Sequence, residues 1–302
     1  MANGKGMRVG FIGASGMMGH GMAKNILAKG HPLAITVHRN EAAVKDLLAA
    51  GATRVDSPAA LAEASDVVFI CVTGSPQVEQ QFHGPKGLLE GGRKGLYIVD
   101  CSTSEPDSTA RLRSAAAAKG MVLVDAPLAR TPVEAEQGRL NVIIGASAAD
   151  HAALEPVLKT FAENVFHVGE AGAGHTVKLL NNFIAQAICT AAAEAFAVGA
   201  KAGVDPRKLV DVVSAGGVNS GLFQAMGKTL GGDMEGLKFG LDNARKDIRY
   251  YTHLAESANV PSVVGEAVHQ TLCLASALGY GGEFVPSLVK AQEKLTGVKL
   301  VP

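Results

Sequence analysis

The feature that most constrains this chain is a long helical pattern between Gly172 and Gly203. Apolar residues recur there at a spacing of three and four, which predicts one buried face of a single helix. At about 1.5 Å per residue such a helix would be on the order of 40 Å long, enough to link two domains. The apolar positions that we expect to be buried are Val177, Leu180, Ile184, Ile188, Ala191, Ala195 and Val198.

Two polar residues interrupt this pattern, Lys178 and Asn182, and they stand four positions apart. Their side chains should therefore project from the same side of the helix, one turn above the other. Two ordinary alternatives stay open. A lysine in an apolar helix is often a surface residue whose amine reaches water. A stretch this apolar also resembles a membrane span, although its repeated polar residues are costly in lipid.

The composition narrows the range of partners. Lysine plus arginine and aspartate plus glutamate each number 28, so the charge gives no support to a nucleic-acid or membrane-surface role. A small neutral partner or a locally recognised anion is expected instead. The four cysteines lie far apart without metal-type spacing, so we expect no metal site and reduced thiols in the cytoplasm. A chain of 302 residues also predicts two domains.

Near its start the chain reads as an apolar strand, a glycine-rich turn and a helix. Gly13, Gly16 and Gly19 are the residues that a tight turn, a close phosphate and close packing of helix on strand would need. The helix N-terminus would then hold a pyrophosphate with its free N–H groups. A glycine turn alone is weak evidence, but a second strand over 33–37 follows where a ribose would be read. The other turn residues that we expect to contact the cofactor are Ser15, Met17 and Met18.

His38, Arg39 and Asn40 follow that second strand and are expected to contact the cofactor. An enzyme that prefers NAD would carry a carboxylate here, which binds the ribose hydroxyls and repels a 2′-phosphate. An arginine pairs with that phosphate instead, so we expect NADP, with NAD as the alternative. An exposed loop arginine is the other interpretation of Arg39.

Further polar residues follow two near-continuous apolar strands, 67–72 and 96–102, which predict a parallel sheet covered on both faces. Ligands of such sheets bind at the carboxyl ends of the strands. Val72 and Thr73 are therefore expected at the adenosine pocket, with a plain turn as the alternative for the loop that begins at Thr73. Ser102 and Thr103 either cap the following helix or donate hydrogen bonds to a substrate carboxylate.

Beyond the long helix the pattern changes to helices alone. We therefore predict an α/β N-terminal Rossmann-type domain over 1–170, with a doubly wound, mostly parallel sheet. A long interdomain helix over 171–203 and an all-α domain over 204–302 complete the chain. Such helical tails usually bury apolar surface against a second subunit, so we expect a homo-oligomer, either a dimer or a tetramer.

Four motifs in order resemble those of the β-hydroxyacid dehydrogenase family, which includes 3-hydroxyisobutyrate dehydrogenase and, more distantly, 6-phosphogluconate dehydrogenase. GFIGASGMMGHGMAKNIL is similar to its cofactor fingerprint, DCSTSEP to D-x-S-T-x-x-P, GAGHTVKLLNN to G-x-G-x-x-x-K-x-x-N-N, and ARKDI to its K-D motif. The resemblance covers nearly the whole chain. It implies a catalytic Lys178 with Asn182 as its partner, substrate contacts from Ser102 and Thr103, and Lys246 with Asp247 near the nicotinamide. For Lys246 and Asp247 a surface ion pair is the alternative.

Two departures from the family pattern stand out. The glycine turn has one extra residue, so that Ser15 adds a phosphate contact. Where the family often has P-V-S-G-G, this chain has Pro-Leu-Ala-Arg-Thr, ending at Thr131. That loop resembles the sulfolactaldehyde reductase branch, which implies that Ala129, Arg130 and Thr131 hold the substrate. Arg130 would then bind a second anionic group, with a structural arginine as the alternative.

The resemblance implies a cytoplasmic NAD(P)-dependent oxidoreductase whose partner is a small anionic hydroxyacid or aldehyde. It would interconvert a β-hydroxyacid or hydroxysulfonate and its semialdehyde, with Lys178 as general acid and base. Two alternatives stay open. An imine reductase has a similar fold but typically lacks this lysine, and a dinucleotide-binding protein without catalysis would keep the same fold.

Overall fold

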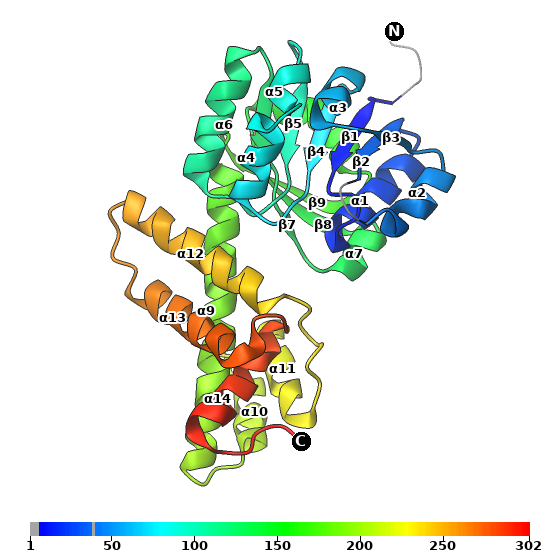
Figure 1. Cartoon of the computed structure of the whole chain (residues 1–302). Coiled ribbons are helices and arrows are strands. Elements are labelled where there is room, and N and C mark those ends of the chain that lie inside the picture. Colours follow the sequence, from blue (N-terminus) through cyan, green and yellow to red (C-terminus); the bar gives the residue numbers. More distant parts are fainter. Residues whose placement is uncertain (1–5, 38–39) are drawn as a thin grey trace. The chain divides into compact units, whose positions relative to one another are not determined.

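The computed structural model describes residues 6–37 and 40–302 of the chain. It divides into two compact units, Met1–Lys178 and Leu179–Pro302. The boundary falls inside helix α9 (Ala173–Lys201), which Figure 1 shows as one continuous helix. The predicted long helix is therefore confirmed, and each unit contains part of it.

The first unit is built on a mostly parallel sheet, as predicted. Its described strands are β1 (Val9–Ile12), β2 (Leu33–Thr36), β3 (Thr53–Val55), β4 (Val67–Ile70), β5 (Tyr97–Asp100), β6 (Val122–Asp125), β7 (Leu128–Ala129), β8 (Leu140–Gly145) and β9 (Ala162–Gly169). They follow the order β3-β2-β1-β4-β5-β6-β8-β7, and β9 pairs with β8. The pairs from β3 to β6 are parallel, whereas β8 runs antiparallel to β6 and β7. The carboxyl ends of β1, β4, β5 and β6 therefore meet at one edge.

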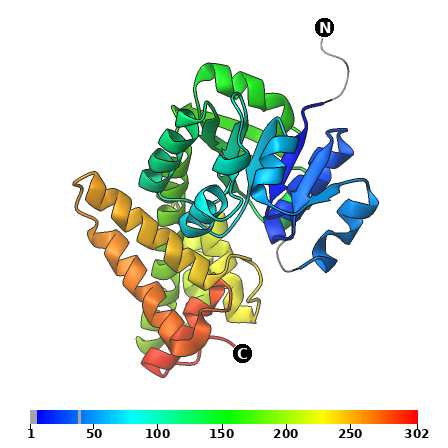
Figure 2. The same ribbon diagram turned by 45° about the horizontal axis from the view of Figure 1, so that its top comes forward.

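Helices cover both faces of this sheet, as Figures 1 and 2 show. They are α1 (Met17–Ala28), α2 (Lys45–Ala49), α3 (Pro58–Ala64), α4 (Ser75–His83), α5 (Leu88–Gly91), α6 (Pro106–Ala118), α7 (Pro132–Glu136) and α8 (Ala148–Leu158). Successive strand residues point to opposite faces. Phe11 and Phe69 accordingly pack with α1 and α8, whereas Val68 and Ile70 pack with α3, α4 and α6.

The sequence predicts only a loop between residues 128 and 138, whereas the structure has α7 there. Thr131 and Glu134 form a capping box at its start, in which each side chain satisfies backbone groups of the first turn. The strand β3 and the helices α4 and α5 are also absent from the prediction. These elements are short and carry little periodicity, so the sequence pattern does not reveal them.

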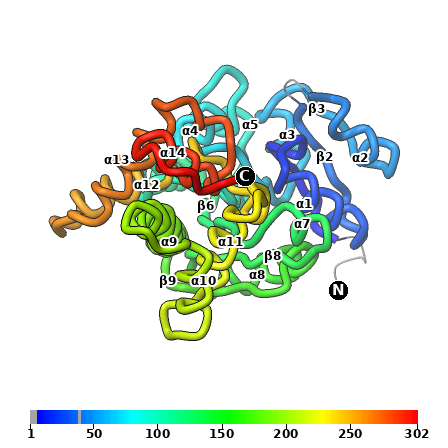
Figure 3. Tube along the Cα trace, turned by 90° about the horizontal axis from the view of Figure 1, so that it is seen from below, coloured from blue at the N-terminus to red at the C-terminus, as the bar shows by residue number. Residues whose placement is uncertain are grey.

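The second unit is helical, as predicted. With the C-terminal part of α9 it contains α10 (Pro206–Ser214), α11 (Gly221–Lys228), α12 (Leu241–Ser257), α13 (Val263–Ala275) and α14 (Leu288–Thr296). Phe196 of α9 packs in one core with Phe223, Ile248 and Leu272. The helices α12 and α13 lie side by side, which can be followed in Figures 2 and 3. The long helix is thus a core element of this unit.

The prediction of the buried face of α9 was wrong. Leu180, Ile184 and Val198, which we expected inside, are 43%, 58% and 61% exposed. The buried residues instead include Asn182 and Gln186. Hydrophobic spacing misjudged the face because it assigns polar residues to the surface, whereas the Asn182 side chain is buried with a hydrogen-bond partner.

By length and composition, α9 would suffice to cross a membrane. A mean hydropathy of 1.5 brings it into that range. However, Cys189, Phe196 and their neighbours on α9 lie in the core of the second unit, as in the core helix of a soluble protein. The helix is therefore weak evidence for a membrane span.

Candidate active site

The glycine turn after β1 has the geometry that a dinucleotide requires. Gly13 has a φ of +94°, and a Cβ on Gly19 would lie 2.2 Å from the Gly13 carbonyl oxygen. Both positions therefore exclude a side chain. A Cβ on Gly16 would approach only that same oxygen, at 3.2 Å. Among the described residues no side chain caps the N-terminus of α1, so its first N–H groups suit a phosphate.

The other predicted cofactor residues of the first unit are placed in part. Met17 is exposed at the turn, and Ser15 and Met18 are partly buried. Asn40 is exposed and accepts a hydrogen bond from the Ala43 N–H at 3.2 Å. His38 and Arg39 lie outside the described residues, so the predicted 2′-phosphate contact stays a prediction.

Two hydrogen bonds join the predicted substrate loop to the loop after β4. The Val72 N–H donates to Ser102 Oγ at 3.0 Å, and the Glu105 N–H donates to Ser75 Oγ at 2.8 Å. Ser102 is buried, Val72 and Thr103 are partly exposed, and Thr73 is exposed. The predicted substrate and adenosine loops are thus held together at the carboxyl edge of the sheet.

Two buried aspartates end neighbouring strands at this edge. Asp100 accepts hydrogen bonds from the Ser102 N–H at 2.9 Å and from Ser104 Oγ at 2.8 Å. Asp125 is its register partner on β6. It accepts the N–H groups of Gly172 at 2.5 Å and His175 at 2.8 Å, where α9 begins. A carboxylate at a helix N-terminus stabilises the helix through its dipole and unpaired N–H groups.

The glycines before Lys178 are explained by this contact. Gly172 has a φ of +104°, which favours glycine. A Cβ on Gly174 would lie 2.5 Å from the Ile143 carbonyl oxygen and 2.8 Å from Asp125 Oδ2. The G-x-G pattern therefore lets the first turn of α9 approach β6 and β8. Lys178 follows on the next turn and is partly buried.

In the second unit, the Asp247 carboxylate brings two predicted site residues together. Its Oδ2 accepts a hydrogen bond from Asn182 Nδ2 at 2.6 Å, and its Oδ1 lies 2.6 Å from Lys246 Nζ. The ammonium of Lys246 also lies 4.6 Å from the centroid of the Tyr250 ring. Asn182 and Asp247 are both buried. A buried carboxylate is stabilised by such paired contacts, so this cluster has a defined geometry.

The polar side chains of the loop at 129–131 have partners within the first unit, and their predicted role in substrate binding stays a prediction. Arg130 adopts a φ of +84°, in the left-handed region. Its guanidinium donates to the Arg139 carbonyl at 2.5 Å and pairs with Glu163. The Thr131 hydroxyl donates to Glu134 Oε2 at 2.5 Å. These contacts favour a structural role for both side chains; Ala129 pairs with β8.

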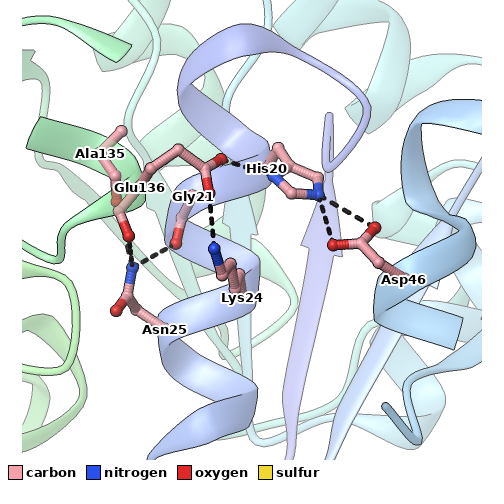
Figure 4. A network of polar contacts seen from close by, with 7 residues as sticks. All are labelled: His20, Gly21, Lys24, Asn25, Asp46, Ala135 and Glu136. Atoms are coloured by element: carbon pink, nitrogen blue, oxygen red, sulfur yellow. Dashed lines mark hydrogen bonds and ion pairs between the residues drawn. The ribbon is translucent and has the colours of Figure 1, made fainter. Parts of the chain in front are cut away.

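A second polar network surrounds His20 on α1 and is drawn in Figure 4. His20 Nδ1 lies 2.6 Å from Glu136 Oε1, and its Nε2 lies 3.1 Å from both Asp46 carboxylate oxygens. Lys24 Nζ donates to Glu136 Oε2 at 3.0 Å. Burial lowers the pKa of His20, but the hydrogen bonds to Glu136 and Asp46 outweigh it and raise the pKa overall.

This network fixes α7 against the helix that begins at the glycine turn. A Cβ on Gly21 would lie 2.4 Å from the carbonyl carbon of Ala135. The Asn25 side chain donates to the Gly21 carbonyl at 2.7 Å and to the Ala135 carbonyl at 3.1 Å (Figure 4). The C-terminal end of α7 is therefore anchored to α1. The sequence gives no sign of this contact, because His20 and Glu136 are far apart along the chain.

Two cysteines also follow strands at the carboxyl edge, after β4 and β5. Burial raises the pKa of the Cys71 thiol to about 12 and that of the Cys101 thiol well above its usual range. A thiol with so high a pKa is a poor nucleophile at neutral pH. Thiolate chemistry is therefore disfavoured at this site.

Comparisons with known proteins agree with this geometry. Two family profiles match: the NAD-binding domain of 6-phosphogluconate dehydrogenase over residues 8–169, and the NAD-binding region of NADP-dependent 3-hydroxyisobutyrate dehydrogenase over 172–291. A 2-(hydroxymethyl)glutarate dehydrogenase from Eubacterium barkeri is 33% identical, over 98% of both chains. A 2-hydroxy-3-oxopropionate reductase from Escherichia coli is 33% identical, over 74% of this chain and 76% of that protein.

A solved structure extends the likeness to three dimensions. A 3-hydroxyisobutyrate dehydrogenase from Salmonella typhimurium has a TM-score of 0.80 and 29% identity, covering 94% of this chain and 99% of that one. A glycine turn on a parallel sheet is the arrangement of a dinucleotide-binding domain, and the matched families and relatives are oxidoreductases. The chain belongs to the β-hydroxyacid dehydrogenase family, in its 3-hydroxyisobutyrate dehydrogenase-like group. It is therefore an NAD(P)-dependent hydroxyacid dehydrogenase.

Proposed function

We propose that this enzyme interconverts a primary alcohol and its aldehyde, with Lys178 as general acid and base. The reacting carbon is attached directly to the carbon that bears a carboxylate. The observation that carries the proposal is the buried Asp247 carboxylate, which binds both Asn182 and Lys246. It joins the N-N motif of α9 to the K-D motif of α12, and Lys178 stands one turn before Asn182.

The substrate class follows from what the relatives share. Their names give 2-(hydroxymethyl)glutarate, 2-hydroxy-3-oxopropionate and 3-hydroxyisobutyrate. Each of these molecules contains a CH2OH group or an aldehyde group attached to a carbon that bears a carboxylate. The first also has a second carboxylate, so a dicarboxylate belongs among the candidates. A hydroxysulfonate keeps the same arrangement with a different anion.

The proposed roles divide proton transfer from binding. The bound nicotinamide supplies or accepts the hydride. Lys178 protonates the developing alkoxide during reduction and takes the hydroxyl proton during oxidation. Asn182, held by Asp247, orients the lysine and the substrate. Ser102 and Thr103 bind the carboxylate, and Ser102 can still donate its proton because its oxygen accepts from the Val72 N–H.

For the cofactor we propose a preference for NADP. The carboxylate that typically selects NAD is missing after β2, where the chain reads His-Arg-Asn. The glycine turn, with the partly buried Ser15, and Val72 with Thr73 would hold the dinucleotide. Lys246 and Asp247 are proposed to lie near its nicotinamide. Arg130 and Thr131 are not assigned to substrate binding, because their side chains are already engaged.

We also propose a homo-oligomer in the cytoplasm. The exposed apolar stripe of α9, which includes Leu180, Ile184 and Val198, supports this assembly. Large apolar side chains gathered on one helix face usually mark a surface that another protein covers. Dimer and tetramer are both compatible with it.

A steady-state panel tests the proposal. The alcohols, which are 2-(hydroxymethyl)glutarate, 3-hydroxyisobutyrate, a hydroxysulfonate and lactate, are assayed with NADP+ and NAD+, and 2-hydroxy-3-oxopropionate and a cyclic imine with NADPH and NADH. We expect turnover of the named class with the phosphorylated cofactor, and none with lactate, whose hydroxyl carbon bears the carboxylate directly. Activity with the imine alone would identify an imine reductase instead. Tight NADPH binding without any turnover would favour a non-catalytic dinucleotide-binding protein.

A further inference from the structure

His175 stands in the first turn of α9, three residues before Lys178, and its side chain is fully buried. One ring nitrogen, Nδ1, lies 2.7 Å from Thr109 Oγ1 on α6. The other, Nε2, lies 3.7 Å from Asp100 Oδ2 and has no hydrogen-bond partner among the described residues. The imidazole therefore lies between α6 and the carboxyl end of β5. A buried polar atom without a hydrogen bond lowers the stability of the fold, so its presence calls for an explanation.

The arrangement fits one form of the neutral ring. The one proton of the Thr109 hydroxyl has two acceptors within reach, His175 Nδ1 at 2.7 Å and the Glu105 carbonyl oxygen at 3.2 Å. When it is donated to the nearer acceptor, Nδ1, the proton of the imidazole stands on Nε2, facing the Asp100 carboxylate. At 3.7 Å this contact is longer than a hydrogen bond. A shift of less than about 1 Å would make it one, and polar contacts at active sites often tighten when substrate binds.

His175 also connects the two buried aspartates. Its backbone N–H donates to Asp125 at 2.8 Å, while its ring faces Asp100. Asp100 in turn accepts the Ser102 N–H and so sets the backbone of the substrate loop. One residue therefore fixes the rotation of the first turn of α9 against both strand ends. Residues three apart on a helix share a side, so this rotation decides where Lys178 points.

We propose that His175 is a positioning residue, whose buried imidazole sets Lys178 relative to the substrate loop through Asp100. The inference rests on the proposed role of Lys178. His175 does not exchange a proton with the substrate. Its contribution is to the alignment of the lysine with the reacting oxygen, which proton transfer requires.

Three variants separate the two faces of the ring. His175→Gln places an amide nitrogen near the position of Nε2 and keeps a donor toward Asp100. His175→Asn reaches only the position of Nδ1 and keeps the Thr109 contact. His175→Leu removes both contacts at similar volume. His31→Gln, at the opposite end of the sheet beside Met7, is the control and should stay within about twofold of wild type.

The readouts are the rate of NADPH oxidation in a single turnover and the Kd for NADPH. We expect the rate of His175→Leu to fall about 10- to 100-fold while the cofactor Kd stays within about threefold. His175→Gln should recover most of the rate, and His175→Asn should not. If His175→Leu does not fold, the Gln and Asn variants still decide the question. Equal rates for Gln and Asn would overturn the proposal.

A double-mutant cycle with Lys178→Met separates positioning from general stabilisation. Residues that act on one step are not additive, so His175→Gln and His175→Asn should have equal rates once Lys178 is removed. A persisting difference between them would overturn the inference. A wild-type rate for His175→Leu beside a defective Lys178→Met would overturn this inference alone. A wild-type rate for Lys178→Met would overturn the proposed function as well.

Discussion

The first unit contains two polar networks that differ in burial and in what they hold. Around His175, two aspartates and the imidazole are buried at the carboxyl edge of the sheet. Around His20, the imidazole is 22% exposed and its partner Asp46 is 59% exposed. Both networks place a histidine beside carboxylates, yet the first joins strands to α9 and the second joins α1 to α2 and α7.

This difference in burial shows that access to solvent determines how much similar contacts stabilise the fold. In the buried network a lost partner leaves a group that water cannot reach, which costs about 1–3 kcal/mol for each group. In the half-exposed network water replaces the lost partner, and an exposed pair contributes only about 0–1 kcal/mol. The buried network should therefore control both stability and activity. The His20 network should tune stability alone.

The largest effect is expected at Asp125. Asp125→Ala leaves the N–H groups of Gly172 and His175 unpaired, so the free energy of unfolding should fall by about 2–4 kcal/mol. Chemical denaturation measures this change. Ser147→Ala, which removes the side-chain cap of α8, is the control and should cost about 1 kcal/mol. An equal loss in the two variants would contradict the larger stabilisation that we assign to the buried contacts of Asp125.

A close contact beside the second network predicts a middle-sized effect. The added methyl group of Gly21→Ala would lie 2.4 Å from the Ala135 carbonyl carbon, so α7 must move, at a cost of about 1–3 kcal/mol. Gly199→Ala on α9 is the matched control, because its Cβ would approach only the Val204 carbonyl, at 4.0 Å. That variant should gain about 0.5–1 kcal/mol from helix propensity. Equal stability of the two variants would show that α7 is not tightly packed on α1.

The smallest effect is expected at His20, and it depends on pH. The pKa of His20 is raised, so its contribution is complete below its ordinary value of 6.5 and disappears as pH rises through the raised pKa. The hydrogen bond from His20 lowers the pKa of Asp46. Burial raises the pKa of Glu136, but the hydrogen bonds from His20 and Lys24 outweigh burial and lower this pKa overall. The two carboxylates therefore stabilise the fold fully at a pH above their ordinary pKa values, and this stabilisation is lost as the pH falls through their lowered pKa values.

The network should therefore contribute most at about pH 5–6. Wild type should exceed His20→Gln by about 0.5–1 kcal/mol there, and the difference should shrink above about pH 8. Thermal unfolding between pH 5 and pH 9 measures it. Lys24→Gln removes the other contact to Glu136 and leaves the His20 imidazole in place, so it is the control and should lower stability evenly across this range. A difference for His20→Gln that grows with pH would contradict the assigned direction of the pKa shift.

The sequence predicts the fold well because its signals are local. The glycine turn, the apolar strands and the change to helices alone each lie within one stretch, and their outcomes agree with the structure. The buried face of α9 was predicted wrongly, since Asn182 is buried by a contact with Asp247, 65 residues away. The same reasoning does not predict a role for His175, because the family motif specifies no residue type at this position. The partners of His175 come from β5, β6 and α6.

The predicted site is only partly accessible from sequence for the same reason. Motifs predict Lys178, Asn182, Lys246 and Asp247, and the structure adds the contacts by which the Asp247 carboxylate joins Asn182 to Lys246. The chemistry of Arg130 suggests an anion, but its left-handed backbone and its pairing with Glu163 direct the side chain elsewhere. Side-chain type therefore predicts what a residue can bind, and the fold determines which partner it meets.

The most direct test of Lys178 is the rate of hydride transfer in a single turnover of Lys178→Met, with NADPH and an accepted aldehyde. Loss of the proton donor should lower this rate by about 100- to 10,000-fold, while the Kd for NADPH stays within about threefold of wild type. A rate close to wild type, with cofactor binding unchanged, would contradict the role of Lys178 as general acid and base.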